Sequence, residues 1–204
     1  MYTVVGNPRN RTFRVLWMLE ELGQEYQITV APPHSDTMRQ GNPGGRSPAL
    51  HDGATIVPDS VAIVTYLADK HGACTHPAGT PGRAWQDAMT QFCVDEIEGA
   101  LWTAAKNSFV HPEEHRCSGV VPTCKYEFAK AMATLERHLD GREFIAGDTF
   151  TVPDLLLGHC SRWAINASFD IPDGPVADYF SRMRDRPAFA RAGEKGAAAV
   201  EAAA

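Results

Sequence analysis

Five arginines fall within the first fifty residues of a chain whose formal net charge is −6. If the fold gathers their side chains, they form a positive pocket suited to a small anion. If it does not, they are ordinary solvated arginines, and the charge pattern alone leaves both interpretations open. The five are Arg9, Arg11, Arg14, Arg39 and Arg46.

A proline precedes an expected buried strand in residues 45–50, which read GRSPAL. Proline has no amide hydrogen, so a strand that begins with Pro48 leaves a neighbouring backbone group without a partner. Taken alone, these residues fit an ordinary trans proline at the start of an edge strand. They also raise the question of what the open backbone groups would bind.

The next group able to bind an anion is Asp59-Ser60, at the start of an expected helix. Ser60 is a typical N-cap residue, and a helix N-terminus can hold a carboxylate. Capping alone is the simpler explanation of the pair from the local sequence, and a carboxylate site is the alternative.

Strands and helices alternate before about residue 75, which predicts a small α/β domain with a mixed sheet. Asp52-Gly53 is a strong hairpin signal between two short strands. Residues 31–48 are poorly patterned and leave a helix there open. The expected strands are Tyr2–Val5, Tyr26–Val30, Ala49–His51 and Thr55–Val57, and the expected helices are Thr12–Leu22 and Ser60–Lys70.

Residues 74–82 contain two prolines and two glycines without apolar periodicity, which is typical of a linker. We therefore expect one domain over residues 1–73 and an all-helical domain over residues 83–204. The alanine-rich end of the chain is expected to be a frayed helix or a disordered tail. The expected helices are Arg83–Lys106, Thr123–Leu139, Thr151–Ala164, Val176–Arg184 and a last one after Pro187.

Composition limits the function. The chain has 204 residues, of which 44% are hydrophobic, enough for one sizeable core or two small ones. The negative charge argues against nucleic acid as a partner. The absence of a long apolar run and of a secretory leader pattern argues against a membrane and favours a cytoplasmic protein. The five cysteines form no CxxC pair and are expected to be reduced packing residues.

Other polar groupings are weaker candidates. His111 and His115 in HPEEH have the spacing of two zinc ligands on one helical face, but an exposed turn explains them better. The acidic residues 95, 96 and 98 suit a solvated helix face better than acid–base chemistry. Thr151 and Asp154 form a variant of the capping box, which is a folding device.

Four motifs in this order and spacing resemble the cytosolic, bacterial-type glutathione S-transferase family, and the resemblance covers nearly the whole chain. It implies a thioredoxin-like N-terminal domain, with a mixed four-stranded sheet and helices, joined to an all-helical C-terminal domain. The motifs are NRTFRVLWMLEELG at residues 10–23, NPGGRSPAL at 42–50, PDSVAIVTYL at 58–67 and FIAGDTFTVPDLLL at 144–157.

The resemblance also implies a glutathione site. The matching proline is cis in that family, and the backbone of Ser47 beside Pro48 then pairs with the cysteine portion of glutathione like an added strand. Ser60 matches the residue that binds the γ-glutamyl carboxylate, and Asp59 the one that meets its ammonium group. The remaining glutathione candidates are Arg46 and His34, which match positions at the glycine end, and Arg9.

The thiol-activating residue is where this sequence departs from the better-known classes. Residues 6–12 (GNPRNRT) contain no tyrosine or cysteine, and Thr12 supplies their only hydroxyl. Asn10 matches best the family's serine or asparagine, and its amide can donate to a thiolate with help from Arg11 and the helix end. A shift of the alignment would bring in Asn7, Arg9 or Thr12 instead.

The resemblance implies a glutathione transferase whose bound thiolate attacks an electrophilic, largely apolar second substrate. Trp102, Phe109 and Trp163 are candidates for the second-substrate pocket, although aromatic residues of a helical domain are more often core. No metal or cofactor is expected besides glutathione as co-substrate, and a homodimer is expected. The alternatives are a non-catalytic binding or regulatory protein and a glutathione-dependent reductase or peroxidase.

Overall fold

A mixed four-stranded sheet organises the first part of the chain in the computed structural model, which describes residues 1–204. The strand order is β2-β1-β3-β4. The first two strands of the chain pair in parallel, and β3 pairs antiparallel with both β1 and β4. This is the predicted mixed sheet, and its strands are β1 (Tyr2–Val5), β2 (Tyr26–Thr29), β3 (Ala49–Asp52) and β4 (Thr55–Pro58).

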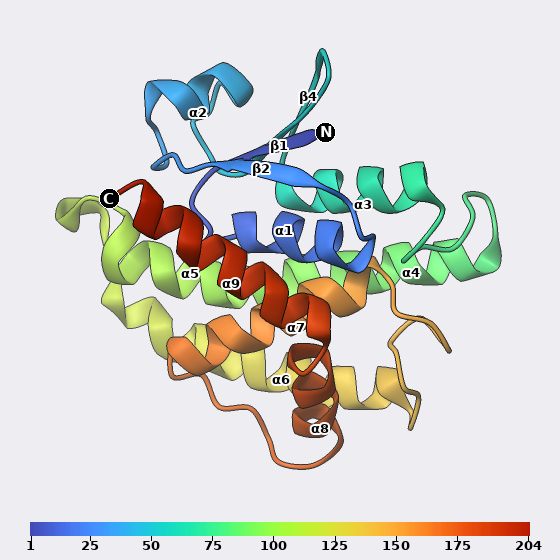
Figure 1. Cartoon of the computed structure of the whole chain (residues 1–204). Coiled ribbons are helices and arrows are strands. Elements are labelled where there is room, and N and C mark those ends of the chain that lie inside the picture. Colours follow the sequence, from blue (N-terminus) through green and yellow to red (C-terminus); the bar gives the residue numbers. More distant parts are fainter. The chain divides into compact units, whose positions relative to one another are not determined.

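Helices cover both faces of this sheet. Helices α1 (Thr12–Glu21) and α3 (Ser60–His71) pack together on one face, and α2 (Asp36–Gly41) lies on the other (Figure 1). The short α2 falls in the segment whose pattern was poor. It is held by a small apolar core in which Met38 meets Val5, Ala31 and Ala49. The sheet thus has a hydrophobic layer on each side.

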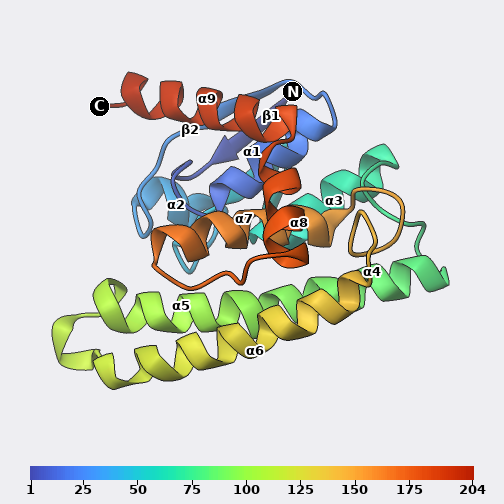
Figure 2. The same ribbon diagram turned by 90° about the horizontal axis from the view of Figure 1, so that it is seen from below.

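The chain divides into two compact units, of which the second is Ala78–Arg184 and entirely helical. The predicted helix over residues 83–106 is interrupted by a π-helical stretch, Cys93–Glu98, and a second one, Lys106–Val110, follows it. Both stretches belong to the helical run that contains α5 and packs beside α6 (Figure 2). The helices are α4 (Pro81–Phe92), α5 (Gly99–Ala105), α6 (Val121–Leu139), α7 (Val152–Asn166) and α8 (Pro175–Arg184).

The last helix, α9 (Pro187–Ala202), differs from the sequence prediction. Residues 83–204 were expected to form one helical domain with a frayed end, but Asp185–Ala204 belong to the same compact unit as Met1–Pro77. The helix runs along α1 (Figure 1), and the ring of Phe189 lies edge-on to the rings of Phe13 and Trp17, with both pairs of centroids 4.9 Å apart. This aromatic contact is long-range, so the alanine-rich local sequence gave no sign of it.

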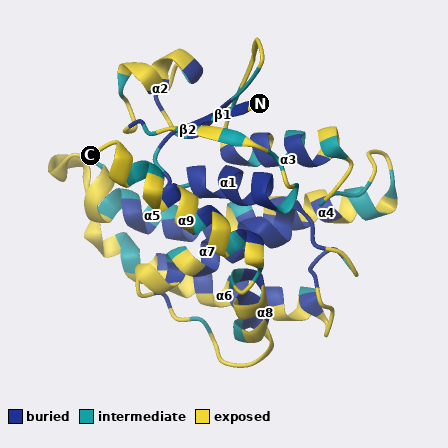
Figure 3. Ribbon diagram, in the orientation of Figure 1, coloured by how far each residue is buried: buried dark blue, intermediate teal, exposed yellow.

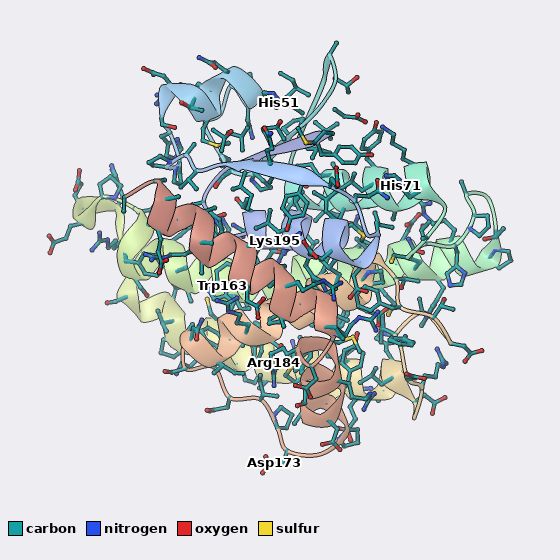
Figure 4. The ribbon with its side chains drawn as sticks, in the orientation of Figure 1. His51, His71, Trp163, Asp173, Arg184 and Lys195 are labelled. Carbon is teal, nitrogen blue, oxygen red and sulfur yellow. The ribbon has the colours of Figure 1, made fainter.

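Ion pairs also join α1 to α9 and to Arg186, the residue before α9. Glu20 is almost buried and accepts hydrogen bonds from Tyr26, Arg191 and Lys195, the last labelled in Figure 4. Glu21 accepts two hydrogen bonds from the guanidinium of Arg186, at 2.6 and 2.9 Å. Burial raises the pKa of Glu20, but the hydrogen bonds from Lys195, Arg191 and Tyr26 outweigh it, so the pKa of this carboxyl is lower than usual.

The second unit has its own buried polar centre at Asp154. Its carboxylate accepts hydrogen bonds from the amide and hydroxyl of Thr151, the amide of Ile145 and the hydroxyl of Tyr179, at 2.7 to 2.9 Å. The reciprocal bonds of Thr151 and Asp154 at the start of α7 confirm the predicted capping box. Burial raises the pKa of Asp154, and the four hydrogen bonds oppose this effect.

The buried residues are concentrated in the elements that lie inside each unit. Figure 3 shows α1 buried along its length, whereas α2, β4 and the outer side of α9 carry exposed residues. None of the helices combines the length and the apolar character that crossing a membrane would need.

We predict that Asp154→Ala destabilises the protein by about 3 kcal/mol or more, because it leaves several buried donors without their acceptor. Urea unfolding followed by circular dichroism measures this loss. Asp173→Ala removes an exposed carboxylate from the same unit (Figure 4) and is expected to change stability by less than about 0.5 kcal/mol. Equal losses of stability in the two variants would contradict the role of Asp154 as a buried acceptor that several donors need.

We also predict that the Glu20 cluster gives stability that acid removes. Because the pKa of Glu20 is lower in the folded than in the unfolded state, this stability is complete above the ordinary glutamate pKa of about 4.3. It is lost as the pH falls through the lower folded value. The free energy of unfolding of Glu20→Gln should therefore vary less than that of the wild type between about pH 5 and pH 3. The exposed control Glu25→Gln should keep the wild-type slope, and identical slopes for all three proteins would refute the prediction.

Candidate functional site

The residues before β3 expose an unpaired stretch of backbone. The peptide bond between Ser47 and Pro48 is cis, as the resemblance implied, and Pro48 is buried. Neither the amide nor the carbonyl of Ser47 makes a hydrogen bond in this structure. These open groups lie beside the central strands of the sheet and are available to an extended peptide.

Asn10 lies against this stretch. Its side-chain oxygen accepts hydrogen bonds from the amide and the hydroxyl of Thr12, both at 2.9 Å. Its side-chain nitrogen donates to the Ser47 hydroxyl at 2.8 Å, across 37 residues of sequence. Gly6 makes this packing possible, because a Cβ there would lie 2.4 Å from the Thr12 hydroxyl oxygen. Two segments of the predicted site are therefore held together by a single side chain.

The five arginines of the first fifty residues do not form a single positive pocket. Arg14 is buried and donates a 3.2 Å hydrogen bond to the Ser60 hydroxyl, and Arg39 lies 3.6 Å from Asp36 within α2. Arg9 and Arg46 are exposed. Arg11 is half-buried at the residue before α1. The arginines that are exposed and could meet an anion at the surface are thus Arg9 and Arg46.

Asp59, and not Ser60, caps α3, which corrects the sequence expectation. The Asp59 carboxylate accepts hydrogen bonds from the amides of Val61 and Ala62, at 2.8 and 3.2 Å. Asp59 also has a φ of 73°, a backbone conformation that is costly for a residue other than glycine and that often marks a binding site. Ser60 is the first helical residue and is buried, with its hydroxyl bonded to Arg14. The amide of Ser60 remains one of the free donors at the helix N-terminus.

His34 and Arg46 lie on loops that are bonded to each other. The His34 amide donates to the Gly45 carbonyl at 2.7 Å, and the side chain of Asn42 donates to the Arg46 carbonyl at 3.1 Å. Gly45 has a φ of 65°, and a Cβ there would lie only 2.9 Å from the Cα of His34. Glycine is therefore required at this close approach, and the exposed side chains of His34 and Arg46 share one end of the site.

Two of the three predicted aromatic residues of the second unit come together. The rings of Trp102 and Trp163 lie edge-to-face with centroids 6.3 Å apart, and His159 lies 6.4 Å from Trp163, which Figure 4 labels. Phe109 makes no ring contact and is 69% exposed. The structure thus contains an aromatic cluster of Trp102, Trp163 and His159. The sequence indicated the two tryptophans but not His159.

The two weaker candidates from the sequence are the His111–His115 pair and the acidic residues 95, 96 and 98, and the structure supports neither as a functional site. Glu113–His115 form a short 3-10 helix, so His111 and His115 do not share one face of an α-helix. In residues 1–204 there is no group of three or more histidine, cysteine or acidic side chains that could hold a metal. A cavity of about 520 Å³ lies between α5 and α6, with Asp95, Glu96 and Glu127 in its lining. With three carboxylates against the single Lys130, this lining does not suit an anionic ligand.

Comparisons with known proteins agree with the resemblance. Residues 10–70 match the model of the glutathione S-transferase N-terminal domain. The chain is similar to glutathione S-transferases. It is 24% identical to glutathione S-transferase GstA of Escherichia coli O157:H7, over 83% of this chain and 86% of the relative. Rat glutathione S-transferase theta-2 is 30% identical over 60% of this chain and 52% of its own length.

Solved structures of the family show the same fold. A theta class glutathione S-transferase from Xanthomonas axonopodis pv. citri, with glutathione bound, has a TM-score of 0.77 and 25% identity, covering 94% of this chain and 96% of its own. The glutathione transferase URE2P8 of Phanerochaete chrysosporium, with oxidized glutathione, has a TM-score of 0.83 and 21% identity, covering 98% and 96%. The chain therefore has the glutathione S-transferase fold.

Sequence reasoning missed the side chain of Ser47. It assigned only the backbone of that residue to the site, because nothing local links a serine at position 47 to an asparagine at position 10. Two hydroxyl groups, those of Thr12 and Ser47, bond to the two ends of the Asn10 amide. The candidate site thus combines an open backbone edge, a helix N-terminus and a fixed polar side-chain network.

We predict that Gly45→Ala weakens glutathione binding at least tenfold while the fold is retained, because the strained backbone and the contact with His34 move the loop. Calorimetric titration with glutathione measures the affinity, and circular dichroism verifies the fold. Gly44→Ala is the matched control, since Gly44 is exposed, and a Cβ there has its nearest neighbour at 3.3 Å. Unchanged affinity in Gly45→Ala would exclude this loop from the site.

Proposed function

We propose that this protein binds glutathione in its first unit and activates the glutathione thiol for transfer to an electrophile. The observation that carries the proposal is the pair of open Ser47 backbone groups beside the cis bond to Pro48. A protein that used this fold only as a scaffold would have no need of a peptide-binding edge. The match of residues 10–70 to the glutathione S-transferase N-terminal domain and the similarity to glutathione S-transferase GstA support the proposal.

Each part of glutathione has a partner in the site. The cysteine portion pairs with the Ser47 amide and carbonyl as an added strand. The γ-glutamyl carboxylate is held by the amide of Ser60 at the N-terminus of α3, and the ammonium group by the Asp59 carboxylate. Arg46 and His34 are exposed side chains on the joined loops that suit the glycine carboxylate.

The chemistry is nucleophilic attack by sulfur. The glutathione thiol releases its proton to solvent, and the thiolate forms a new carbon–sulfur bond with the electrophile. In a substitution the leaving group departs with the electron pair of the broken bond, and in an addition the electron pair moves to the acceptor and is protonated. The enzyme contributes thiolate stabilisation and proximity, so the proposal requires no metal or organic cofactor.

The partners of this reaction are proposals as well. The Trp102–Trp163 pair is the candidate apolar surface for the second substrate, and it favours an electrophile with a flat or largely hydrocarbon body. The family resemblance makes a two-fold homodimer the expected assembly.

The position of the cysteines bears on the reductase or peroxidase alternative. Cys74 is the only cysteine of the first unit, and it follows the C-terminal end of α3. Ser60 begins that helix of 12 residues, which spans about 18 Å. The first unit thus has no thiol of its own near the candidate site, so disulfide exchange within this unit would use the thiol groups of glutathione. Transfer to an electrophile needs only one such thiol and is the function we favour.

Titration of the purified protein with glutathione tests the proposal, with an ultraviolet scan for the thiolate band of the bound sulfur. We expect binding and a thiolate band near neutral pH. Arg46→Ala and Asp59→Asn should each weaken glutathione binding about tenfold, because each removes a charged partner worth about 1 to 2 kcal/mol. Arg39→Ala, which removes an exposed arginine from α2, is the control and should bind normally. No binding at millimolar glutathione would refute the proposal and leave a non-catalytic scaffold.

A further inference from the structure

The Asn10 amide is fixed in one orientation. Both donors of Thr12 point at its oxygen, so the nitrogen must face the other way, toward the Ser47 hydroxyl. Turning the amide over would place its N–H groups against the Thr12 amide, which can only donate, and would break that hydrogen bond. The network therefore assigns the donor and the acceptor end of this side chain without ambiguity.

The Ser47 hydroxyl accepts the hydrogen bond from Asn10 and donates none in this structure. A serine hydroxyl has one hydrogen to donate, so the Ser47 proton is available to a further acceptor. Accepting a hydrogen bond also polarises the hydroxyl and strengthens the bond that it donates. The half-buried Ser47 thus carries an oriented donor that the fold itself does not use.

The position of Ser47 directs this donor toward the cysteine portion of a bound glutathione. In an antiparallel pair, residues directly opposite each other have their side chains on the same face, with Cβ atoms about 4.5 to 5.5 Å apart. If the backbone of Ser47 pairs with the cysteine of glutathione, the Ser47 hydroxyl and the glutathione sulfur are such neighbours. The side chain of Asn10 lies one hydrogen bond further away.

We propose that the Ser47 hydroxyl, oriented by Asn10, donates the hydrogen bond that stabilises the glutathione thiolate. Ser47 is then the catalytic residue, and Asn10 is a positioning residue that acts through it. This inference rests on the proposed function and revises the sequence expectation, which gave the thiolate contact to Asn10 itself. No proton is transferred from Ser47: the thiol proton goes to solvent, and the hydroxyl keeps its own hydrogen.

The decisive measurement is the pKa of the glutathione thiol bound to the protein, from the ultraviolet thiolate band recorded against pH. We expect Ser47→Ala to raise this pKa by about one unit or more, so that the thiolate fraction at neutral pH falls severalfold. Glutathione affinity should fall by no more than the pKa shift itself accounts for, because the backbone groups of residue 47 remain. Transferase turnover with a model electrophile should fall near neutral pH and recover at alkaline pH.

Three further variants separate this role from a structural one. Ser47→Thr keeps the hydroxyl and should retain a bound-thiol pKa close to that of the wild type. Asn10→Ala should raise the pKa in the wild-type background but add nothing to Ser47→Ala, because Asn10 acts through the hydroxyl. Ser118→Ala removes an exposed hydroxyl from the second unit and serves as the control for serine replacement.

The outcomes distinguish this inference from the proposed function. If the wild type binds no glutathione or shows no bound thiolate, the proposed function fails and this inference fails with it. If the wild type shows the thiolate and Ser47→Ala leaves its pKa unchanged in a folded protein, only the role of Ser47 is refuted. A further rise of the pKa when Asn10→Ala is added to Ser47→Ala would return the thiolate contact to Asn10.

Discussion

The structure of the first unit depends on the burial of α1 along nearly its whole length. Every residue from Thr12 to Glu20 is buried, so each polar side chain among them must find a partner inside the protein. Arg14 finds the hydroxyl of Ser60 on α3, and Glu20 finds two cations of α9. The helix therefore fixes the elements around it through paired charges as well as through apolar contact.

The candidate site is built at the N-terminal end of this buried helix. Asn10 accepts a hydrogen bond from the amide of Thr12, where α1 begins, and donates one to Ser47, just before β3. Arg14, one turn along α1, bonds to Ser60 at the start of α3. One rigid helix thus positions the strand edge and the helix N-terminus that the glutathione proposal requires, and little rearrangement is needed before a ligand binds.

Different side chains can meet the same chemical demand. A thiolate needs one well-oriented donor at the correct distance, and a tyrosine, a serine or an amide can supply it. Here the loop before α1 offers no tyrosine, but a hydroxyl reaches the same region from the cis-proline loop. The absence of the better-known activating residues is therefore weak support for a non-catalytic protein, because position matters more than residue type.

The sequence by itself determined the elements, the mixed sheet and the capping box at Thr151 and Asp154, because hydrophobic periodicity, turn residues and capping pairs act over a few neighbouring residues. The assignment of Pro48, Asp59 and Ser60 to the candidate site followed from a resemblance in motif order. Only the tertiary structure decided that α9 joins the first unit, because its aromatic and ionic partners on α1 lie more than 160 residues away. The same holds for Asn10 and Ser47, whose hydrogen bond exists only once β1 and β3 have paired and brought two distant loops to one edge of the sheet.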